Sequence, residues 1–417
     1  MTEPSSLRLD PTWLHEPALA RLLEALDGNG EEARVVGGAV RNVLIGVPVD
    51  EIDIATTAIP PEVVRRVEAA GFKAVPTGIE HGTITVVADG RGFEVTTLRE
   101  DIETFGRRAK VAFGRDWRRD AERRDFTINA LSMARDGQVF DYVGGLADIE
   151  QRRVRFIGDA KLRIAEDYLR ILRFFRFHAG YGEGPPDPDG LHACIAARAG
   201  LGQLSRERVR MEMLKLVVAV HAVPALAVMT EAGLLVTVLG GVPLLASFSS
   251  MGKLEAVLKQ PPDPVRRLGA LGVYLVEDAD RLRERLRLAN AEHERLAAMA
   301  DRWWRISALT DERKGRALLY LLGLTKFTDR VLLAWSRAPE SAHDPRWQKL
   351  ARLPERWTPP VFPLKAADFI VRGVDKGPAL GAALRAAEEA WVAADFPSDP
   401  AALDTIAGEA ARAARPM

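Results

Sequence analysis

Two carboxylates follow a glycine-rich turn in the first part of the chain. The turn is Gly37-Gly38-Ala39-Val40-Arg41, and the acidic segment is Asp50-Glu51-Ile52-Asp53-Ile54. Residues two apart on a strand point to one face, so a strand over residues 51–55 would bring Glu51 and Asp53 together. Carboxylate oxygens suit Mg²⁺, which bridges nucleotide phosphates, activates an attacking hydroxyl and stabilises a leaving pyrophosphate. An isolated acid pair is usually a surface feature, but a Gly-Gly turn that exposes backbone N–H groups to a triphosphate favours a metal-dependent nucleotide site.

A third carboxylate, Glu94, lies in the β-branched run Phe93-Glu94-Val95-Thr96-Thr97. Two interpretations are open. Glu94 is an exposed hairpin residue, or its strand pairs beside residues 51–53 and Glu94 becomes a third member of the carboxylate group.

Two further motifs combine arginine with aspartate. Arg123-Arg124-Asp125 precedes an apolar run for which we expect a helix. Arginine forks bind phosphate oxygens in pairs and an aspartate accepts a sugar hydroxyl, although a capping Asp with surface arginines is the structural alternative.

The second motif, Glu166-Asp167-Tyr168-Leu169-Arg170, falls within a helix expected over residues 164–179. Asp167 and Arg170 would be neighbours on one face, where an ordinary salt bridge is one interpretation. In the other, an acceptor beside a donor matches the amino group and ring nitrogen of cytosine or adenine, whereas uracil and guanine present the reverse order. Such a site rejects the wrong base because its own groups then stay unpaired.

The elements around these motifs predict a mixed α/β head followed by helices. We expect strands over residues 33–36 and 51–55 and helices over 39–45 and 61–70. A hairpin of strands 82–88 and 92–98 should follow, with its turn at Asp89-Gly90-Arg91. After about residue 150 the apolar spacing is helical throughout. The pattern therefore predicts an α/β head over about residues 1–150, followed by a long helical body and tail.

The bulk composition agrees with a soluble protein of several domains. The chain has 417 residues, 47% hydrophobic and 28% charged, with a net charge of zero. A single cysteine, Cys194, excludes internal disulfides and cysteine metal clusters. Residues 1–11 lack a signal pattern and no apolar run spans a membrane, so we expect a cytoplasmic protein. Residues 107–124 and 152–176 each hold eight Arg or Lys against three Asp or Glu, which favours phosphate binding.

In order and spacing, these motifs resemble the class II tRNA nucleotidyltransferase and bacterial poly(A) polymerase family. The resemblance implies a polymerase-β-like α/β head over residues 1–150, followed by an all-α neck over 151–220, body over 221–355 and tail over 356–417. The resemblance covers about residues 33–180, through the segments 37–55, 78–85, 94–99, 123–130, 141–148 and 166–176. It thins beyond residue 180, where segments 205–215 and 366–381 look like a helix behind the nucleotide site and part of the tail.

The resemblance implies a role for each site residue. Glu51 and Asp53 would hold Mg²⁺, with Glu94 as a further catalytic carboxylate. Glu166, Asp167 and Arg170 would form the base-reading set, in which Glu166 braces Arg170. The residues implied for binding CTP and ATP are Gly37, Gly38, Arg41, Arg124, Asp125, Asn129 and Arg173. Residues 104–115 look like the family's mobile loop.

Two positions depart from the family pattern: the family usually has Asp where this chain has Glu51, and Asp where this chain has Asn42. Glu is longer by one methylene and still ligates magnesium. A register in which Asp50 replaces Glu51 would put Asp50 and Asp53 on opposite faces, so we favour Glu51.

The expected activity is addition of CCA to the 3′ end of tRNA. Alternatives within the family are a poly(A) polymerase and an enzyme that adds only CC or only A. Residues 78–85 look like the tRNA-adding branch, and the intact 104–115 segment argues against a CC-only enzyme. The three acids argue against an inactive RNA-binding relative, and scattered histidines argue against a phosphohydrolase. The oligomeric state is open.

Overall fold

The computed structural model describes residues 7–79, 82–105 and 108–414. It divides into two compact units, Met1–Val238 and Leu239–Met417. The first holds the strands and the second is helical, which confirms the predicted fold class. The finer division into head, neck, body and tail stays a prediction.

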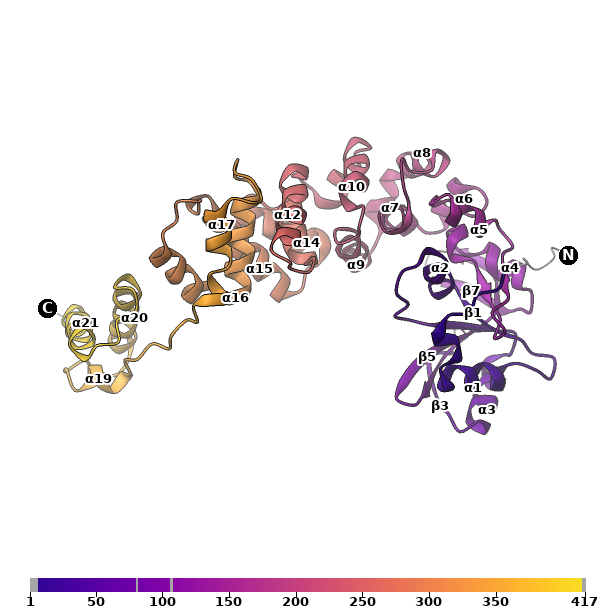
Figure 1. Cartoon of the computed structure of the whole chain (residues 1–417), viewed down its shortest axis with the longest axis horizontal. Helices are drawn as coiled ribbons and strands as arrows, with labels where there is room; N and C mark the ends of the chain where they lie inside the picture. The colour runs from indigo at the N-terminus through magenta and orange to yellow at the C-terminus, as the bar shows by residue number, and fades with distance from the viewer. Residues whose placement is uncertain (1–6, 80–81, 106–107, 415–417) are drawn as a thin grey trace. The chain divides into compact units, whose positions relative to one another are not determined.

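A seven-stranded mixed sheet forms the centre of the first unit (Figure 1). Its order is β3-β4-β5-β2-β1-β8-β9. The strands are β1 (Ala33–Val36), β2 (Asp53–Thr56), β3 (Lys73–Gly78), β4 (Thr83–Ala88), β5 (Arg91–Thr97), β8 (Ser132–Met133) and β9 (Val139–Phe140).

The predicted hairpin joins β4 to β5. Asp89 and Gly90 both have positive φ, as a two-residue turn between twisted strands requires. β5 then pairs in parallel with β2, with Asp53 opposite Glu94. The pairing on which the hypothesis for Glu94 depended is therefore present.

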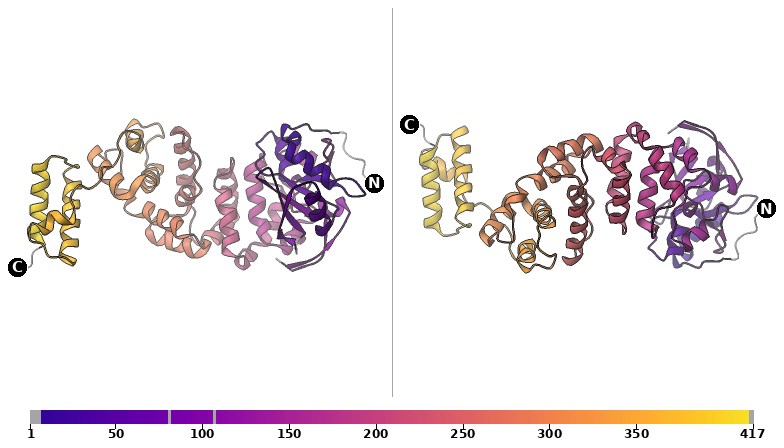
Figure 2. Two further views of the ribbon diagram at one scale, coloured as in Figure 1. Left: turned by 90° about the horizontal axis from the view of Figure 1, so that it is seen from below. Right: turned by 90° about the horizontal axis from the view of Figure 1, so that it is seen from above.

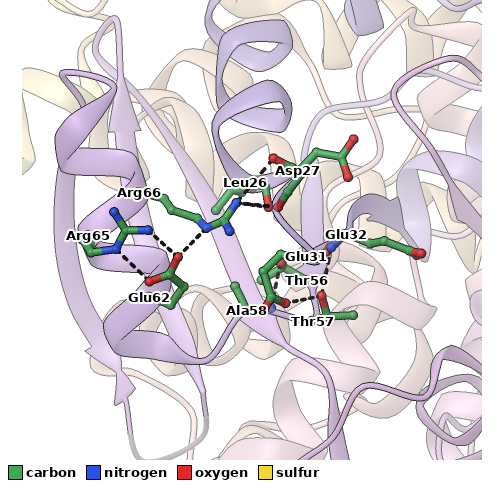
Figure 3. Close-up of polar contacts among 12 residues, drawn as sticks. Leu26, Asp27, Glu31, Glu32, Thr56, Thr57, Ala58, Glu62, Arg65 and Arg66 are labelled. Carbon is green, nitrogen blue, oxygen red and sulfur yellow. Dashed lines mark hydrogen bonds and ion pairs between the residues drawn. The ribbon is translucent and has the colours of Figure 1, made fainter.

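Helices α1 (Pro17–Leu26) and α3 (Pro60–Ala69) pack together and against the sheet. Arg66 of α3, only 8% exposed, donates hydrogen bonds to the carbonyls of Leu26, Asp27 and Gly28 and pairs with Glu62 (Figure 3). These bonds satisfy carbonyls that the end of α1 leaves without helical partners. The contact ties two distant segments into one layer, in which α1 packs on β1 and β4 and α3 packs on β3, β4 and β5.

Residues 104–115, predicted as a mobile loop, belong largely to a separate two-stranded sheet. β6 (Arg99–Phe105) pairs antiparallel with β7 (Arg108–Phe113). Residues 106 and 107 of that segment lie outside the described residues, as do Glu80 and His81 of the segment 78–85.

The first unit contains further helices besides α1 and α3. They are α2 (Gly38–Ile45, between β1 and β2), α4 (Trp117–Glu122), α5 (Gly145–Glu150), α6 (Ala160–Glu166), α7 (Leu169–Tyr181), α8 (Pro188–Ala196), α9 (Arg206–Leu216), α10 (Ala222–Glu231) and α11 (Leu234–Leu239). Aromatic rings pack α7 against residues earlier in the chain. Phe156 stacks on Phe174 of α7 with 5.4 Å between ring centroids, and the ring centroid of Phe126 lies 5.2 Å from that of Phe177. This packing fixes where α7 stands relative to the sheet.

The single helix predicted over residues 164–179 is wrong. α6 ends at Glu166, and Asp167 has extended backbone angles, φ −156° and ψ 107°, before α7 begins at Leu169. The Asp167 carboxylate accepts the backbone N–H of Leu169, as aspartates do at helix starts. Asp167 therefore stands at a break between two helices.

The second unit consists of helices. They are α12 (Leu245–Val257), α13 (Pro264–Gly272), α14 (Val276–Leu286), α15 (Asn290–Ala300), α16 (Glu312–Ser336), α17 (Pro345–Ala351), α18 (Leu353–Arg356), α19 (Ala366–Ile370), α20 (Pro378–Ala393) and α21 (Pro400–Ala413). Figure 2 shows α20 and α21, in yellow, side by side. In the α12–α16 region, buried Arg266 pairs with Glu255 and with fully buried Asp329. None of the helices in the described part of the chain combines the length and apolarity needed to cross a membrane.

Candidate active site

A cleft of about 680 Å³ in the first unit brings most of the predicted residues together. The predicted residues that line it are Gly37, Gly38, Arg41, Glu51, Asp53, Glu94, Arg124, Asp125, Asn129, Asp167, Arg170 and Arg173. Glu166 does not line this cleft and instead borders a neighbouring hollow. Residues from the sheet, from α2 and from α7 thus surround one space.

The carboxylates gather where β2 begins. The strand predicted over residues 51–55 begins only at Asp53, because β1 ends at Val36 and offers no partner to earlier residues. Glu51 precedes the strand, so its place in the cleft does not follow from strand alternation. Asp53 nevertheless faces the same cleft as Glu51 and Glu94.

The electrostatic environment of Asp53 is that of a site with excess negative charge. Its side chain opens to the cleft, yet burial by the surrounding protein and the charges of Glu94 and Glu51 raise its pKa. Among the described residues, no three His, Cys, Asp or Glu side chains lie close enough together to hold one metal ion jointly. A place for Glu94 in a metal cluster therefore stays a prediction.

The Gly-Gly turn opens α2 toward the cleft, as expected. Gly37 has φ +67°, and a Cβ atom there would stand 3.2 Å from Arg124 Nη1. The position therefore favours glycine both by conformation and by space. Gly38 begins α2, whose first backbone N–H groups lack helical partners.

Arg41 is 6% exposed and is held by neutral oxygens. Its Nε and Nη2 donate to Asn42 Oδ1 at 3.2 and 2.8 Å, Nη1 donates to Asn129 Oδ1 at 2.5 Å, and Nη2 donates to the hydroxyl of Tyr181 at 2.8 Å. Burial lowers the pKa of Arg41 from its usual value, but an arginine remains charged at neutral pH. Asn42 thus anchors this arginine.

Arg124 and Asp125 lie in a turn, and the helix expected after them is absent. Residues 127–129 form a single 3-10 turn that leads into β8. Buried Asp120 accepts hydrogen bonds from Arg124 Nε and Nη2 at 3.4 and 3.2 Å, and it also pairs with Arg123.

Asp125 pairs with Arg173 of α7 at 2.6 Å. Burial alone would raise the pKa of Asp125, but the charge of Arg173 and hydrogen bonds from Asn129 and Arg173 lower it below its usual value. This pair connects the turn after α4 with α7.

The salt bridge between Asp167 and Arg170, one of the two interpretations of this motif, does not form. Asp167 pairs with Arg208 of α9 at 2.5 Å, whereas Arg170 pairs with Glu166 and donates to the carbonyl of Arg163 at 2.6 Å. Both side chains line the cleft. The contact between Glu166 and Arg170 is the one that the bracing hypothesis requires.

Several residues of the cleft were not predicted from the sequence: Asp120, Arg176, Phe177 and Tyr181. Asp120 had a signal, since it stands four residues before Arg124 at the spacing of a helical ion pair. Tyr181 had none, because its partner Arg41 lies 140 residues away in the sequence.

Comparisons with known proteins agree with this geometry. A family model described as the poly A polymerase head domain matches residues 33–155, and one described as a probable RNA and SrmB-binding site of polymerase A matches residues 186–248. The human mitochondrial CCA tRNA nucleotidyltransferase 1 is 34% identical over 383 residues, covering 91% of this chain and 87% of its own length. The CCA-adding enzyme of Limosilactobacillus fermentum is 32% identical over 405 residues, covering 95% and 96%.

Among solved structures, the CCA-adding enzyme of Bacillus stearothermophilus in complex with CTP superposes with a TM-score of 0.75. It is 27% identical to this chain, and the match covers 95% of this chain and 98% of the other. The family expected from the motifs is thereby confirmed: this chain belongs to the family of CCA-adding enzymes, the tRNA nucleotidyltransferases.

Proposed function

We propose that this chain adds C, C and A to the 3′ end of tRNA, without a nucleic-acid template, from CTP and ATP. The observation that carries the proposal is one cleft lined both by the carboxylates Glu51, Asp53 and Glu94 and by the side chains of Asp167 and Arg170. The first set suits phosphoryl chemistry, and the second suits recognition of a base. Relatives named for CCA addition, aligned over most of their length, support the same activity.

The donor set of the cleft fits magnesium. Asp53 and Glu51 offer hard carboxylate oxygens. Burial and the charges of Glu94 and Glu51 raise the pKa of Asp53, and a divalent cation would offset those charges. Bound there, magnesium would lower the pKa of the attacking hydroxyl and offset charge on the departing pyrophosphate. Glu94, opposite Asp53 in the strand pair, is the further catalytic carboxylate in this proposal.

The other residues of the cleft hold the nucleotide. The start of α2 at Gly38 and the guanidinium groups of Arg41 and Arg124 face the triphosphate, and Asp125 and Asn129 lie beside the ribose. The 3′ hydroxyl of the RNA gives its proton to water, and its oxygen bonds to the α-phosphorus while the bond from that phosphorus to the bridging oxygen breaks. Pyrophosphate leaves with the electron pair.

Asp167 and Arg170 select the base. In this proposal Asp167 accepts from the amino group of cytosine or adenine, and Arg170 donates to the adjacent ring nitrogen. Arg208 and Glu166 hold these two side chains in place. Uracil and guanine leave both groups unpaired, which disfavours their binding.

The RNA partner is the acceptor end of tRNA, recognised mainly by shape and phosphate. The helices after residue 220 contribute to that recognition, with the tail from residue 356 as a contact surface. A cytoplasmic location remains part of the proposal, from the single cysteine.

A competition between acceptors tests this function. The purified chain, CTP, ATP and magnesium are incubated with equal amounts of tRNA lacking its CCA end and an unstructured oligo(A) of similar length. We expect the tRNA to gain three nucleotides and the oligo(A) to stay unextended. Long tails on the oligo(A), with the tRNA ignored, would instead identify a polyadenylating enzyme.

A further inference from the structure

Arg41 is positioned without being neutralised. Its four hydrogen bonds to Asn42, Asn129 and Tyr181 use four of the five guanidinium N–H groups, and every acceptor is an uncharged oxygen. One Nη1 N–H is left over. Since a carboxylate partner would cancel the charge of Arg41, neutral acceptors fix the group while leaving its charge available to an anion in the cleft.

Tyr181 supplies the contact that comes from outside the head. It is the last residue of α7, whereas Arg41 belongs to α2. The guanidinium carbon of Arg41 lies 3.9 Å from the centre of the Tyr181 ring, within the range of a cation–π contact. Phe177, one turn earlier in α7, stacks on Tyr181 with 5.8 Å between ring centroids and so supports the ring.

We propose that Tyr181 is a positioning residue for nucleotide binding, which holds Arg41 of α2 in the orientation that meets the nucleotide triphosphate. The proposal rests on the proposed function for the identity of the ligand, and it deepens that function by adding a residue. Tyr181 itself touches no reacting atom.

The arrangement has a consequence for how the cleft works. α7 begins just after Asp167 and carries Arg170, and its last residue holds Arg41, which lines the same cleft. A change in the position of α7 therefore moves Arg41 as well. Binding of the base and binding of the phosphates are linked through one helix.

Affinity for CTP, measured by titration calorimetry with magnesium and without RNA, tests the proposal. Tyr181→Phe removes the hydroxyl and keeps the ring, and Tyr181→Leu removes both. We expect the dissociation constant to rise roughly three- to tenfold for Tyr181→Phe and further for Tyr181→Leu. In transfer assays, KM for CTP should rise with little change in kcat.

A double-mutant cycle shows whether Tyr181 acts through Arg41. In an Arg41→Met background, Tyr181→Phe should cause no additional loss of CTP affinity, because the group that it positions is gone. An equal loss in both backgrounds would overturn the proposal.

Tyr142→Phe is the matched control. The Tyr142 hydroxyl also accepts from a buried arginine, Arg34 Nη1 at 3.1 Å, but Tyr142 does not line the cleft. The control should bind CTP as the wild type does. If the two Tyr181 variants lower the melting temperature but bind CTP like the wild type, Tyr181 is only structural and the proposal is wrong.

The calorimetric readout separates this proposal from the proposed function. Loss of CTP affinity in the expected order, in a protein that extends no tRNA, would contradict CCA addition and support the role of Tyr181. Normal CCA addition with unchanged CTP affinity in all Tyr181 variants would do the opposite.

Discussion

Asp53 and Glu94 stand opposite each other on two parallel strands, although 41 residues separate them in the sequence. The register puts both carboxylates at the cleft. Burial raises the pKa of Asp53, and the charges of Glu94 and Glu51 raise it further. A site that accumulates negative charge in this way binds cations, and the chemistry proposed for the chain depends on that property.

Removal of Asp53 tests the metal site. Asp53→Ala should lower the rate of nucleotide transfer about a thousandfold or more at any magnesium concentration, because the cation loses its main ligand. Glu51→Asp should keep activity if Glu51 is a ligand, since it shortens the side chain and retains the carboxylate. The readout is single-turnover extension of tRNA, with circular dichroism to show that the fold is intact. Turnover like that of the wild type in Asp53→Ala would refute the assignment.

The Asp125–Arg173 pair predicts how stability depends on pH. Because the pKa of folded Asp125 lies below its unfolded value of about 3.9, its charged form stabilises the fold above that pH. The contribution is lost as pH falls through the lower, folded pKa. Asp125→Asn should cost about 3 kcal/mol in the free energy of unfolding at pH 7, because buried Asn cannot neutralise Arg173.

Urea unfolding of both proteins between pH 7 and pH 3 measures this difference. It should shrink once the pH drops below about 4, because Asp125 of the unfolded wild type then takes up a proton while folded Asp125, with its lower pKa, still resists protonation. A difference that stays constant down to pH 3 would show that the charge of Asp125 does not stabilise the fold.

Asp167 and Arg170 are expected to decide which nucleotides are used. Loss of either group should reduce the use of CTP and ATP while letting UTP or GTP be incorporated, because the site no longer penalises the wrong base. Wild-type discrimination of about a hundredfold or more should fall in Asp167→Ala and Arg170→Ala. Steady-state kinetics with each of the four triphosphates gives the ratios.

A purely structural role for these residues makes a different prediction. Both variants would then melt at lower temperature and turn over more slowly, yet reject UTP and GTP as sharply as the wild type. That outcome would move base selection elsewhere, with residues 104–115 as the next candidate.

The buried ion network of the second unit predicts a large stability effect. Asp329 is fully buried and accepts hydrogen bonds from Arg266 Nε at 2.9 Å and Arg295 Nε at 2.8 Å. Asp329→Asn should lower the free energy of unfolding by about 3 kcal/mol, since two arginines, Arg266 and Arg295, each lose one of their carboxylate partners. Lys314→Ala, which breaks an exposed pair with Asp311, is the control and should leave calorimetric melting unchanged. Equal melting temperatures for both variants would contradict the prediction.

Local signals in the sequence predicted much of the head. The hairpin with its turn at Asp89 and Gly90, and the helix whose first two residues are Pro60 and Pro61, depend on neighbouring residues. The parallel register between β2 and β5 could not be derived, because it is decided by packing between distant segments. It entered the sequence analysis only as a condition on the role of Glu94.

The break at Asp167 is a second feature that the sequence pattern did not predict. Helical spacing predicts a continuous helix, but the Asp167 carboxylate binds the N–H of Leu169 and pairs with Arg208, 41 residues later. The same holds for Arg41 and Tyr181, whose contact depends on where α7 packs. Residue types and spacing identified the chemistry, while tertiary contacts determined which side chains hold one another.

The nucleotides added to a tRNA without its CCA end test the central claim most directly. The purified chain is incubated with that tRNA and one labelled triphosphate at a time, then with pairs, and the product ends are sequenced. We predict two C residues from CTP alone, no addition from ATP alone, and CCA followed by a stop from the two together. Long A tails from ATP alone, or an end other than CCA when both are present, would contradict CCA addition by this chain.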